Sequence, residues 1–246
     1  MTKGRLLVVN HRGVDVPATL GFALLAGGAA STVAVAVADH VVSAGWITAT
    51  GAALVFAAGM VDDLMPGGPR GIRAHIRAIA QGHVSSGIVK LVVVTAVAVV
   101  TVASSGGRPG WVRIAGVLLL AACANLWNGL DVRPGRALMF AYLAAPAFGA
   151  CPWAAAPFVP GVGLAAVLVL PLDAGERAML GDAGANLLGF TVGVALYGAL
   201  TDAQVVAGAL VAIALNVLAE TVTFSRVIDA VPPLRWFDRI GRRPMA

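Results

Sequence analysis

The feature that most constrains this chain is a series of long apolar runs separated by polar connections. There are eight such runs, at 18–38, 46–61, 87–103, 111–127, 137–153, 157–172, 185–200 and 203–222. A helix that crosses a bilayer needs about 20 mainly apolar residues. Charged residues make up 12% of the chain, whereas a soluble domain carries about 25%. The sequence therefore predicts an all-α, polytopic integral membrane protein with about eight transmembrane helices.

Basic residues are distributed unevenly over the connections between these runs. With eight spans the connections alternate between two sides, and only Arg108 and Arg113 fall on one of them. The rest of the 17 basic residues lie on the side of the termini: Lys3, Arg5, Arg12, Arg70, Arg73, Arg77, Lys90, Arg133, Arg136, Arg177, Arg226, Arg235, Arg239, Arg242 and Arg243. Cytoplasmic loops carry the excess of lysine and arginine. Both termini are therefore predicted to be cytoplasmic, at a plasma or inner membrane.

The chain is expected to be one transmembrane domain over 1–246, with a core over 10–222 and a tail over 223–246. The tail is basic and amphipathic, with Trp236 and Phe237 between arginines, and such a segment typically lies on a membrane surface. The positive charge follows the cytoplasmic loops, so no nucleic-acid partner is predicted. The region 137–172 is interrupted by four prolines, Pro146, Pro152, Pro157 and Pro160. It could therefore form either two full spans or one broken hairpin.

Asp62 and Asp63 end the second apolar run and precede the basic stretch "RGIRAHIR". Adjacent carboxylates at a membrane boundary can share a proton or hold a divalent cation. Arg73 and Arg77 share a face if the stretch is helical, and with His75 they could bind phosphate oxygens. The alternative is that the aspartates cap the next segment while the arginines contact anionic lipid headgroups.

The heptapeptide "NLWNGLD" follows an apolar run directly. Asn125, Asn128 and Asp131 are spaced three apart, so one helical face would carry all three. Polar groups are costly to bury in hydrocarbon and mark functional sites by default. The alternative is a helix C-terminus followed by a turn at Pro134 and Gly135.

A third motif, "MLGDAGANLLG", opens an apolar helix expected to begin near Ala185. A carboxylate in a glycine-rich turn, here Asp182, suits a metal ligand, and an N-cap is the alternative. Asn186 lies on the same first turn. Together the three motifs place carboxylates at the inner ends of different helices, as a site for a lipid and a soluble phosphorylated substrate would require. Mg²⁺ fits such a site, because it binds through one or two carboxylates plus substrate phosphates.

The order of these motifs resembles the polyprenyl-phosphate N-acetylhexosamine-1-phosphate transferases, a family that includes phospho-N-acetylmuramoyl-pentapeptide transferase and UDP-N-acetylglucosamine undecaprenyl-phosphate transferases. The family order is N-x-R-G-x-x-V-P, hDD, GL…K, N-x-x-D-G-x-D-G and hGD-x-G. This chain reads "NHRGVDVPATLG", "MVDD", "RGIRAHIR", "NLWNGLD" and "MLGDAGANLLG". The resemblance extends from about Asn10 to Glu220, and five motifs in one order are far more specific than any one of them.

The resemblance implies magnesium-dependent transfer of a sugar-1-phosphate from a UDP-linked N-acetylated sugar to a membrane polyprenyl phosphate such as undecaprenyl phosphate. UMP is released, and the pathway is cell-envelope glycan synthesis. Asp182 would be the metal ligand, and Asp62 and Asp63 would lie beside the lipid phosphate, one of them accepting its proton. Asn125 and Asp131 would line the nucleotide-sugar site, and Asp131 is expected to be catalytic together with Asp62 and Asp63. The other residues expected to bind substrate are Asn128, Arg73, His75, Arg77 and Asn186.

The chain departs from the family pattern at several positions. Asn128 stands where the family has an aspartate, Val132 replaces a glycine, and His75 and Arg77 stand at the lysine positions of the basic loop. The last cytoplasmic loop has no histidine cluster, and eight spans are expected here where family members usually have ten, the first and the last being the ones without a counterpart. The alternative hypothesis is a catalytically silent homologue that binds polyprenyl phosphate or scaffolds envelope enzymes. A transporter fits less well, because the polar residues gather at one membrane face. A homodimer is compatible with the sequence.

Overall fold

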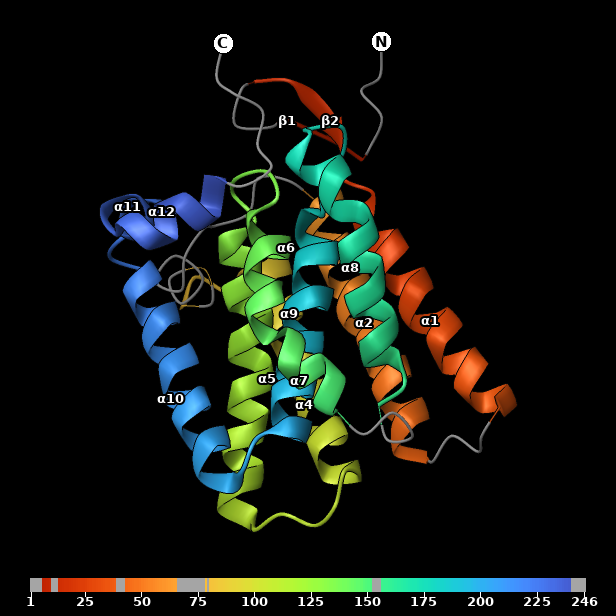
Figure 1. The fold of residues 1–246 in the computed structure, drawn as a ribbon. Helices are drawn as coiled ribbons and strands as arrows, with labels where there is room; N and C mark the ends of the chain where they lie inside the picture. The colour runs from red at the N-terminus through yellow and green to blue at the C-terminus, as the bar shows by residue number, and fades with distance from the viewer. Residues whose placement is uncertain are drawn as a thin grey trace.

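The computed structural model describes residues 6–9, 13–38, 43–65, 78, 80–151 and 156–239. These residues form a helix bundle with a two-stranded hairpin and two short helices at one end (Figure 1). The bundle helices are α1 (Leu20–Ala38), α2 (Ser43–Leu64), α4 (Ser86–Ser104), α5 (Gly110–Leu130), α8 (Phe158–Ala174), α9 (Gly181–Ala199) and α10 (Asp202–Ala219). The described residues are mainly helical, which confirms the expected all-α class, and the small hairpin is an addition that the sequence did not predict.

Five helices in the described part of the chain are long and apolar enough to cross a membrane, namely α1, α2, α4, α5 and α10. This result supports an integral membrane protein. The runs predicted at 137–153 and 157–172 form shorter apolar helices, and α9, although 19 residues long, is not one of the five. The expected number of eight spans is therefore matched only in part.

The region 136–150 is a helix in three pieces. It comprises α6 (Arg136–Ala141), a 3₁₀ turn η1 (Tyr142–Ala144) and α7 (Ala145–Ala150). Pro146 lies in the first turn of α7, where a residue without an N–H is tolerated but the preceding helix cannot continue through it. Proline therefore accounts for the break that the sequence indicated at this point.

The central helix of the bundle is α9, which packs against α5, α2 and α1. Small residues allow these close contacts, because they let helix backbones approach one another in lipid. A Cβ on Gly59 of α2 would lie 2.6 Å from the Cα of Ala183, and one on Gly21 of α1 would lie 2.7 Å from the Cα of Gly184. The start of α9 is thereby held against two neighbouring helices.

The hairpin consists of β1 (Leu7–Val9) and β2 (Asp15–Pro17), which pair antiparallel with Val8 opposite Val16. It also holds the segment that leads into α9. The N–H of Met179 donates to the carbonyl oxygen of Pro17 at 2.9 Å, and the N–H of Leu20 donates to that of Met179 at 3.1 Å. The chain ahead of α1 is thus fixed beside the start of α9.

The described part of the tail forms α11 (Phe224–Ala230) and α12 (Pro232–Arg239), which lie at the same end of the bundle as the hairpin (Figure 1). The apolar side of α12 faces the protein, because the Phe237 ring packs edge-on against Phe140 with centroids 5.6 Å apart. Trp236 and Arg235 are exposed. The tail is amphipathic as predicted, but its inward face packs on the bundle.

Candidate functional site

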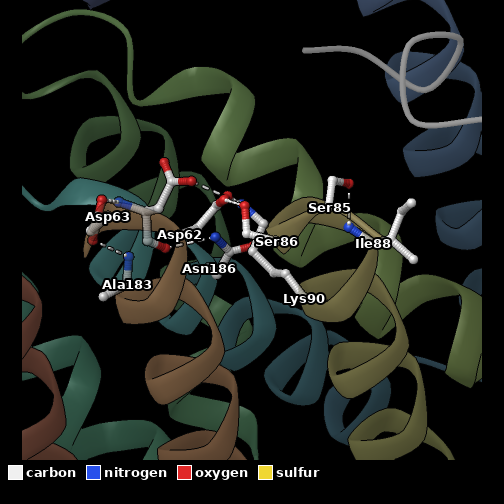
Figure 2. A network of polar contacts seen from close by, with 9 residues as sticks. Asp62, Asp63, Ser85, Ser86, Ile88, Lys90, Ala183 and Asn186 are labelled. Carbon is white, nitrogen blue, oxygen red and sulfur yellow. Dashed lines mark hydrogen bonds and ion pairs between the residues drawn. The ribbon is translucent and has the colours of Figure 1, made fainter. Parts of the chain in front are cut away.

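The site begins with a lysine between two carboxylates, at the adjoining ends of α2, α4 and α9. Lys90 Nζ donates to Asp62 Oδ2 at 2.6 Å and to Asp182 Oδ2 at 2.9 Å. The hydroxyl of Ser86, one turn before Lys90, donates to the other oxygen of Asp62. Figure 2 shows Asp62, Ser86 and Lys90 facing one another from the ends of two helices. One cation therefore bridges carboxylates that are 120 positions apart in the chain.

Asp63 has a different role from its neighbour. Its two oxygens accept hydrogen bonds from the backbone N–H groups of Asp182 and Ala183, each at 2.9 Å, and its contact with Ala183 is visible in Figure 2. The first N–H groups of a helix have no partner within the helix, and a carboxylate at the positive end of the dipole is stabilising. Asp63 thus caps α9 from another helix, whereas the sequence alternative was a cap on the following segment.

A glycine in a left-handed conformation makes this arrangement sterically feasible. Gly181, at the start of α9, has φ of 68°, which L side chains rarely adopt. A Cβ at this position would lie 3.0 Å from Asp63 Oδ2. Helix α9 therefore starts at Gly181, earlier than the expected start near Ala185, and Asp182 lies in its first turn.

Asp131 approaches the site from α5, as the residue that follows the last turn of that helix. Burial raises the pKa of the Asp131 carboxyl well above its ordinary value. The neighbouring charges of Asp173, Asp182 and Asp63 raise this pKa further, and a hydrogen bond from the N–H of Gly181 opposes the shift. Asp131 is thus joined to the first residue of α9 by a hydrogen bond, and the charges of carboxyl groups on α2, α8 and α9 act on it.

The three asparagines of the predicted site are placed differently. Asn125 is exposed and donates through Nδ2 to Asn216 Oδ1 of α10 at 2.6 Å. Asn128 has a buried side-chain oxygen that no hydrogen-bond donor of the described residues reaches. Asn186 is buried and donates to the carbonyl oxygen of Asp182 at 2.6 Å, within α9. The structure thus ties Asn186 to the backbone of Asp182 one turn earlier in α9 and joins Asn125 to another helix.

Three predicted phosphate-binding residues, Arg73, His75 and Arg77, lie outside the described residues. The structure adds other polar residues that sequence reasoning did not select as site residues, namely Lys90, Ser86 and Asp173. Lys90 is a lone cation inside an apolar run, and such an intramembrane charge marks a functional site by default. Lys90 could therefore have been selected from the sequence. Its two partners are distant in sequence, so the apolar pattern around Lys90 could not identify them.

The carboxylates of Asp62 and Asp182 supply oxygen ligands, which magnesium prefers. Mg²⁺ usually takes one or two protein carboxylates and completes its shell with water and substrate phosphates. Asp62 and Asp182 place one oxygen each within hydrogen-bonding distance of the same nitrogen, so both can reach a single cation. No group of three His, Cys, Asp or Glu side chains suited to a metal occurs in the described ranges. These two carboxylates offer two oxygen ligands of the kind that Mg²⁺ takes from a protein.

Comparison with known proteins gives no further assignment. The sequence matches no known protein family, no curated protein and no solved structure.

Proposed function

We propose that this protein is a glycosyl-1-phosphate transferase, which moves a sugar-1-phosphate from a UDP-linked N-acetylated sugar to a membrane polyprenyl phosphate and releases UMP. One observation carries the proposal: the carboxylates of Asp62 and Asp182 converge on one cation position where apolar helices end. The motif order resembling the polyprenyl-phosphate transferases supports the same reaction. A lipid substrate and a soluble nucleotide could both reach such a boundary.

In the proposed reaction, a phosphate oxygen of the polyprenyl phosphate attacks the β-phosphorus of the UDP-sugar. A new P–O bond forms, the bond from that phosphorus to the oxygen of the α-phosphate breaks, and UMP leaves with the bonding electrons. Phosphoryl transfer depends mostly on positioning and on neutralising charge. The residues around the cation position would therefore act by holding phosphates in line rather than through covalent chemistry.

The side chains would divide this work. Lys90 would turn from Asp62 and Asp182 to the substrate phosphates and balance their charge, and Asp63 would hold the start of α9 so that Asp182 keeps its place. Asp131 would contact the nucleotide-sugar. Asp62 and Asp182 would hold Mg²⁺, which when bound supplies charge neutralisation at the transferred phosphate.

The proposal places this site on the cytoplasmic side of a plasma or inner membrane, because UDP-sugars are soluble cytoplasmic compounds. The distribution of basic residues supports that orientation under the positive-inside rule. Arg108, on the opposite side, pairs with Asp202 at 2.8 Å at the other end of the bundle. That pair offers a matched carboxylate control far from the proposed site.

The direct test is turnover by purified protein in lipid nanodiscs. The protein is incubated with undecaprenyl phosphate, Mg²⁺ and a panel of UDP-linked N-acetylated sugars, and UMP and lipid-linked sugar are measured. We expect activity in wild type and in Asp202→Asn, and its loss in Asp182→Asn. If no sugar gives product, or if Asp182→Asn is as active as wild type, the proposal is wrong.

A second candidate function is a catalytically silent protein that binds polyprenyl phosphate. One specific observation favours it, since the ammonium of Lys90 lies between the carboxylates that would otherwise hold a metal. In that case Lys90 would permanently neutralise the pair. Binding of undecaprenyl phosphate that is unchanged by chelating Mg²⁺, together with no UMP release from any sugar, would support the silent protein over the enzyme.

A further inference from the structure

The C-terminal helices α11 and α12, here called the C-terminal arm, are fastened to α6 by a buried ion pair. Arg136 Nε donates to Asp238 Oδ1 at 2.7 Å, and Nη2 donates to Oδ2 at 3.1 Å. The Arg136 and Asp238 side chains are 0% and 1% exposed. Nη1 of the same guanidinium donates to Ser225 Oγ of α11 at 2.9 Å. Both arm helices therefore converge on one guanidinium.

Further contacts join the arm to the same region. Arg133 Nη2 pairs with Asp229 Oδ2 at 3.1 Å, and the Phe237 ring packs against Phe140 of α6. The side chains of Arg133 and Asp229 are 33% and 39% exposed, so this pair adds little stability. The buried pair differs, because removing one partner leaves an uncompensated charge away from water.

These contacts surround the loop 131–135, which joins α5 to α6 and begins with Asp131. The loop has a fixed turn, because the N–H of Arg136 donates to the carbonyl oxygen of Arg133 at 3.2 Å and Gly135 has φ of 73°. Before the loop, the N–H of Asp131 donates to the carbonyl oxygen of Trp127 at 3.1 Å. The loop is thus tied to α5 at its start and to the arm at its end.

We propose that Arg136 and Asp238 are positioning residues, which act through the loop 131–135 to hold Asp131 at the site. They do not approach the carboxylates of α2 and α9 in any contact described above. The buried guanidinium has a fork geometry that a carboxylate matches in one orientation. The pair therefore fixes the start of α6, and with it the direction in which the chain leaves Asp131.

Hydrogen exchange tests this link without relying on the proposed reaction. Asp238→Asn removes the negative charge of the buried pair and leaves the charge of Arg136 uncompensated. Asp229→Asn makes the same change in the exposed pair of the same arm. In nanodiscs, Asp238→Asn should speed exchange of amides 131–139 by about tenfold or more, with the amides of α9 unchanged. Asp229→Asn should change the exchange rate of amides 131–139 by less than about fivefold. Equal exchange at 131–139 in wild type and Asp238→Asn would overturn the proposal.

A kinetic measurement separates positioning from general stability, and this part rests on the proposed function. Asp238→Asn should raise the KM for the UDP-sugar by about tenfold, as expected for a misplaced binding group, with the KM for polyprenyl phosphate unchanged. Asp238→Glu, which restores a carboxylate, should recover most of the loss. An equal effect on both KM values, or no recovery in Asp238→Glu, would contradict positioning. Absence of turnover in wild type would refute the proposed function and leave the exchange result valid.

A milder variant keeps the test decisive if Asp238→Asn does not accumulate as folded protein. Ser225→Ala removes only the hydroxyl that accepts from Arg136. This variant should increase exchange of amides 131–139, as Asp238→Asn does, but to a smaller extent. If Ser225→Ala instead leaves the loop unchanged, or increases exchange throughout the bundle equally, the arm does not position Asp131.

Discussion

The carboxylate of Asp63, on α2, accepts a hydrogen bond of 2.9 Å from the backbone N–H of Asp182 at the start of α9. Asp63 therefore acts on the backbone next to the residue that the motif order indicates as a metal ligand. Its neighbour Asp62 points instead to Lys90, at 2.6 Å. Two adjacent aspartates thus fix two different components, one the helix that carries Asp182 and the other the cation beside it.

The first prediction separates a capping role for Asp63 from a proton-accepting role. Asp63→Asn keeps an oxygen that can accept from an N–H of α9, whereas Asp63→Ala removes both acceptors. We expect Asp63→Ala to lower the free energy of unfolding by about 1 kcal/mol, the usual value of a lost cap, and Asp63→Asn to lower it by less. Thermal unfolding in detergent measures both variants.

The same two variants have a distinct outcome in the transferase assay. If Asp63 mainly caps α9, Asp63→Asn should retain much more activity than Asp63→Ala. Equal and complete loss in both variants, with normal unfolding temperatures, would instead indicate that the carboxylate accepts a proton.

The second prediction concerns the cation between Asp62 and Asp182. Lys90→Met removes the ammonium and leaves the carboxylates facing each other. The Asp62 and Asp182 side chains are partly exposed, so we expect a loss on the order of 2 kcal/mol, between the values for exposed and buried ion pairs. Unfolding temperature in detergent, measured without divalent ions, reports this loss.

Magnesium should restore part of that stability. A ligand that binds only the folded protein raises its stability, and without Lys90 the two carboxylates are available to one ion. Mg²⁺ should therefore stabilise Lys90→Met more than wild type, and the double variant Lys90→Met with Asp182→Asn should respond less. Equal stabilisation of all three proteins by Mg²⁺ would show that the lysine and the metal do not compete for one position.

The third prediction is a pH dependence that arises from Asp131. Its folded-state pKa is raised by burial and by neighbouring carboxylates, whereas the unfolded value is about 3.9. A raised pKa stabilises the folded state fully below the unfolded pKa, and this contribution is lost as the pH rises through the folded pKa. As the pH rises, wild type should therefore lose stability relative to Asp131→Asn, because asparagine cannot ionise.

The measurement is the difference in unfolding temperature between Asp131→Asn and wild type, taken across pH. The difference should favour Asp131→Asn increasingly from about pH 4 upward, and become constant once Asp131 is ionised in the folded protein. The asparagine oxygen can still accept from the N–H of Gly181. A difference that does not vary with pH would mean that Asp131 is ionised in the folded protein throughout that range.

The long helices of the bundle could be predicted from sequence, because long apolar runs mark them. The run at 111–127, for example, became α5 (Gly110–Leu130). The site could be predicted only in part. Asp62, Asp63 and Asp182 stand at helix ends that polar patterns mark, and they lie together in the structure. Their division of roles could not be predicted, because it depends on which helix packs beside which, and small residues determine that packing in a membrane protein.

Lys90 and Asn125 illustrate the same limit. A single lysine in an apolar run gives no indication of partners 28 and 92 positions away. Asn125 shares a helical face with Asn128 and Asp131 in the sequence pattern, yet its amide bonds to Asn216 of α10. Helical spacing predicts which residues share a face, but the neighbouring helix decides what that face contacts.

The fourth prediction tests whether close packing of α2 on α9 determines the geometry of the site. A Cβ on Gly59 would lie 2.6 Å from the Cα of Ala183 and 2.6 Å from the carbonyl oxygen of Asp182. Gly59→Ala should therefore force the two helices apart, with an overpacking cost of about 1–3 kcal/mol. Because Asp63 lies one turn further along α2, its hydrogen bonds to α9 should weaken as well.

Gly149→Ala is the matched control, because Gly149 is also helical and a Cβ there meets nothing within 4 Å. It should leave the unfolding temperature unchanged or raise it slightly, since alanine has the higher helix propensity. Hydrogen exchange at the N–H groups of Asp182 and Ala183 should increase in Gly59→Ala and stay constant in Gly149→Ala. If Gly59→Ala lowered stability without changing exchange at these two amides, the packing contact would not control the cap of α9, and Asp63 would hold Asp182 independently of the spacing between the helices.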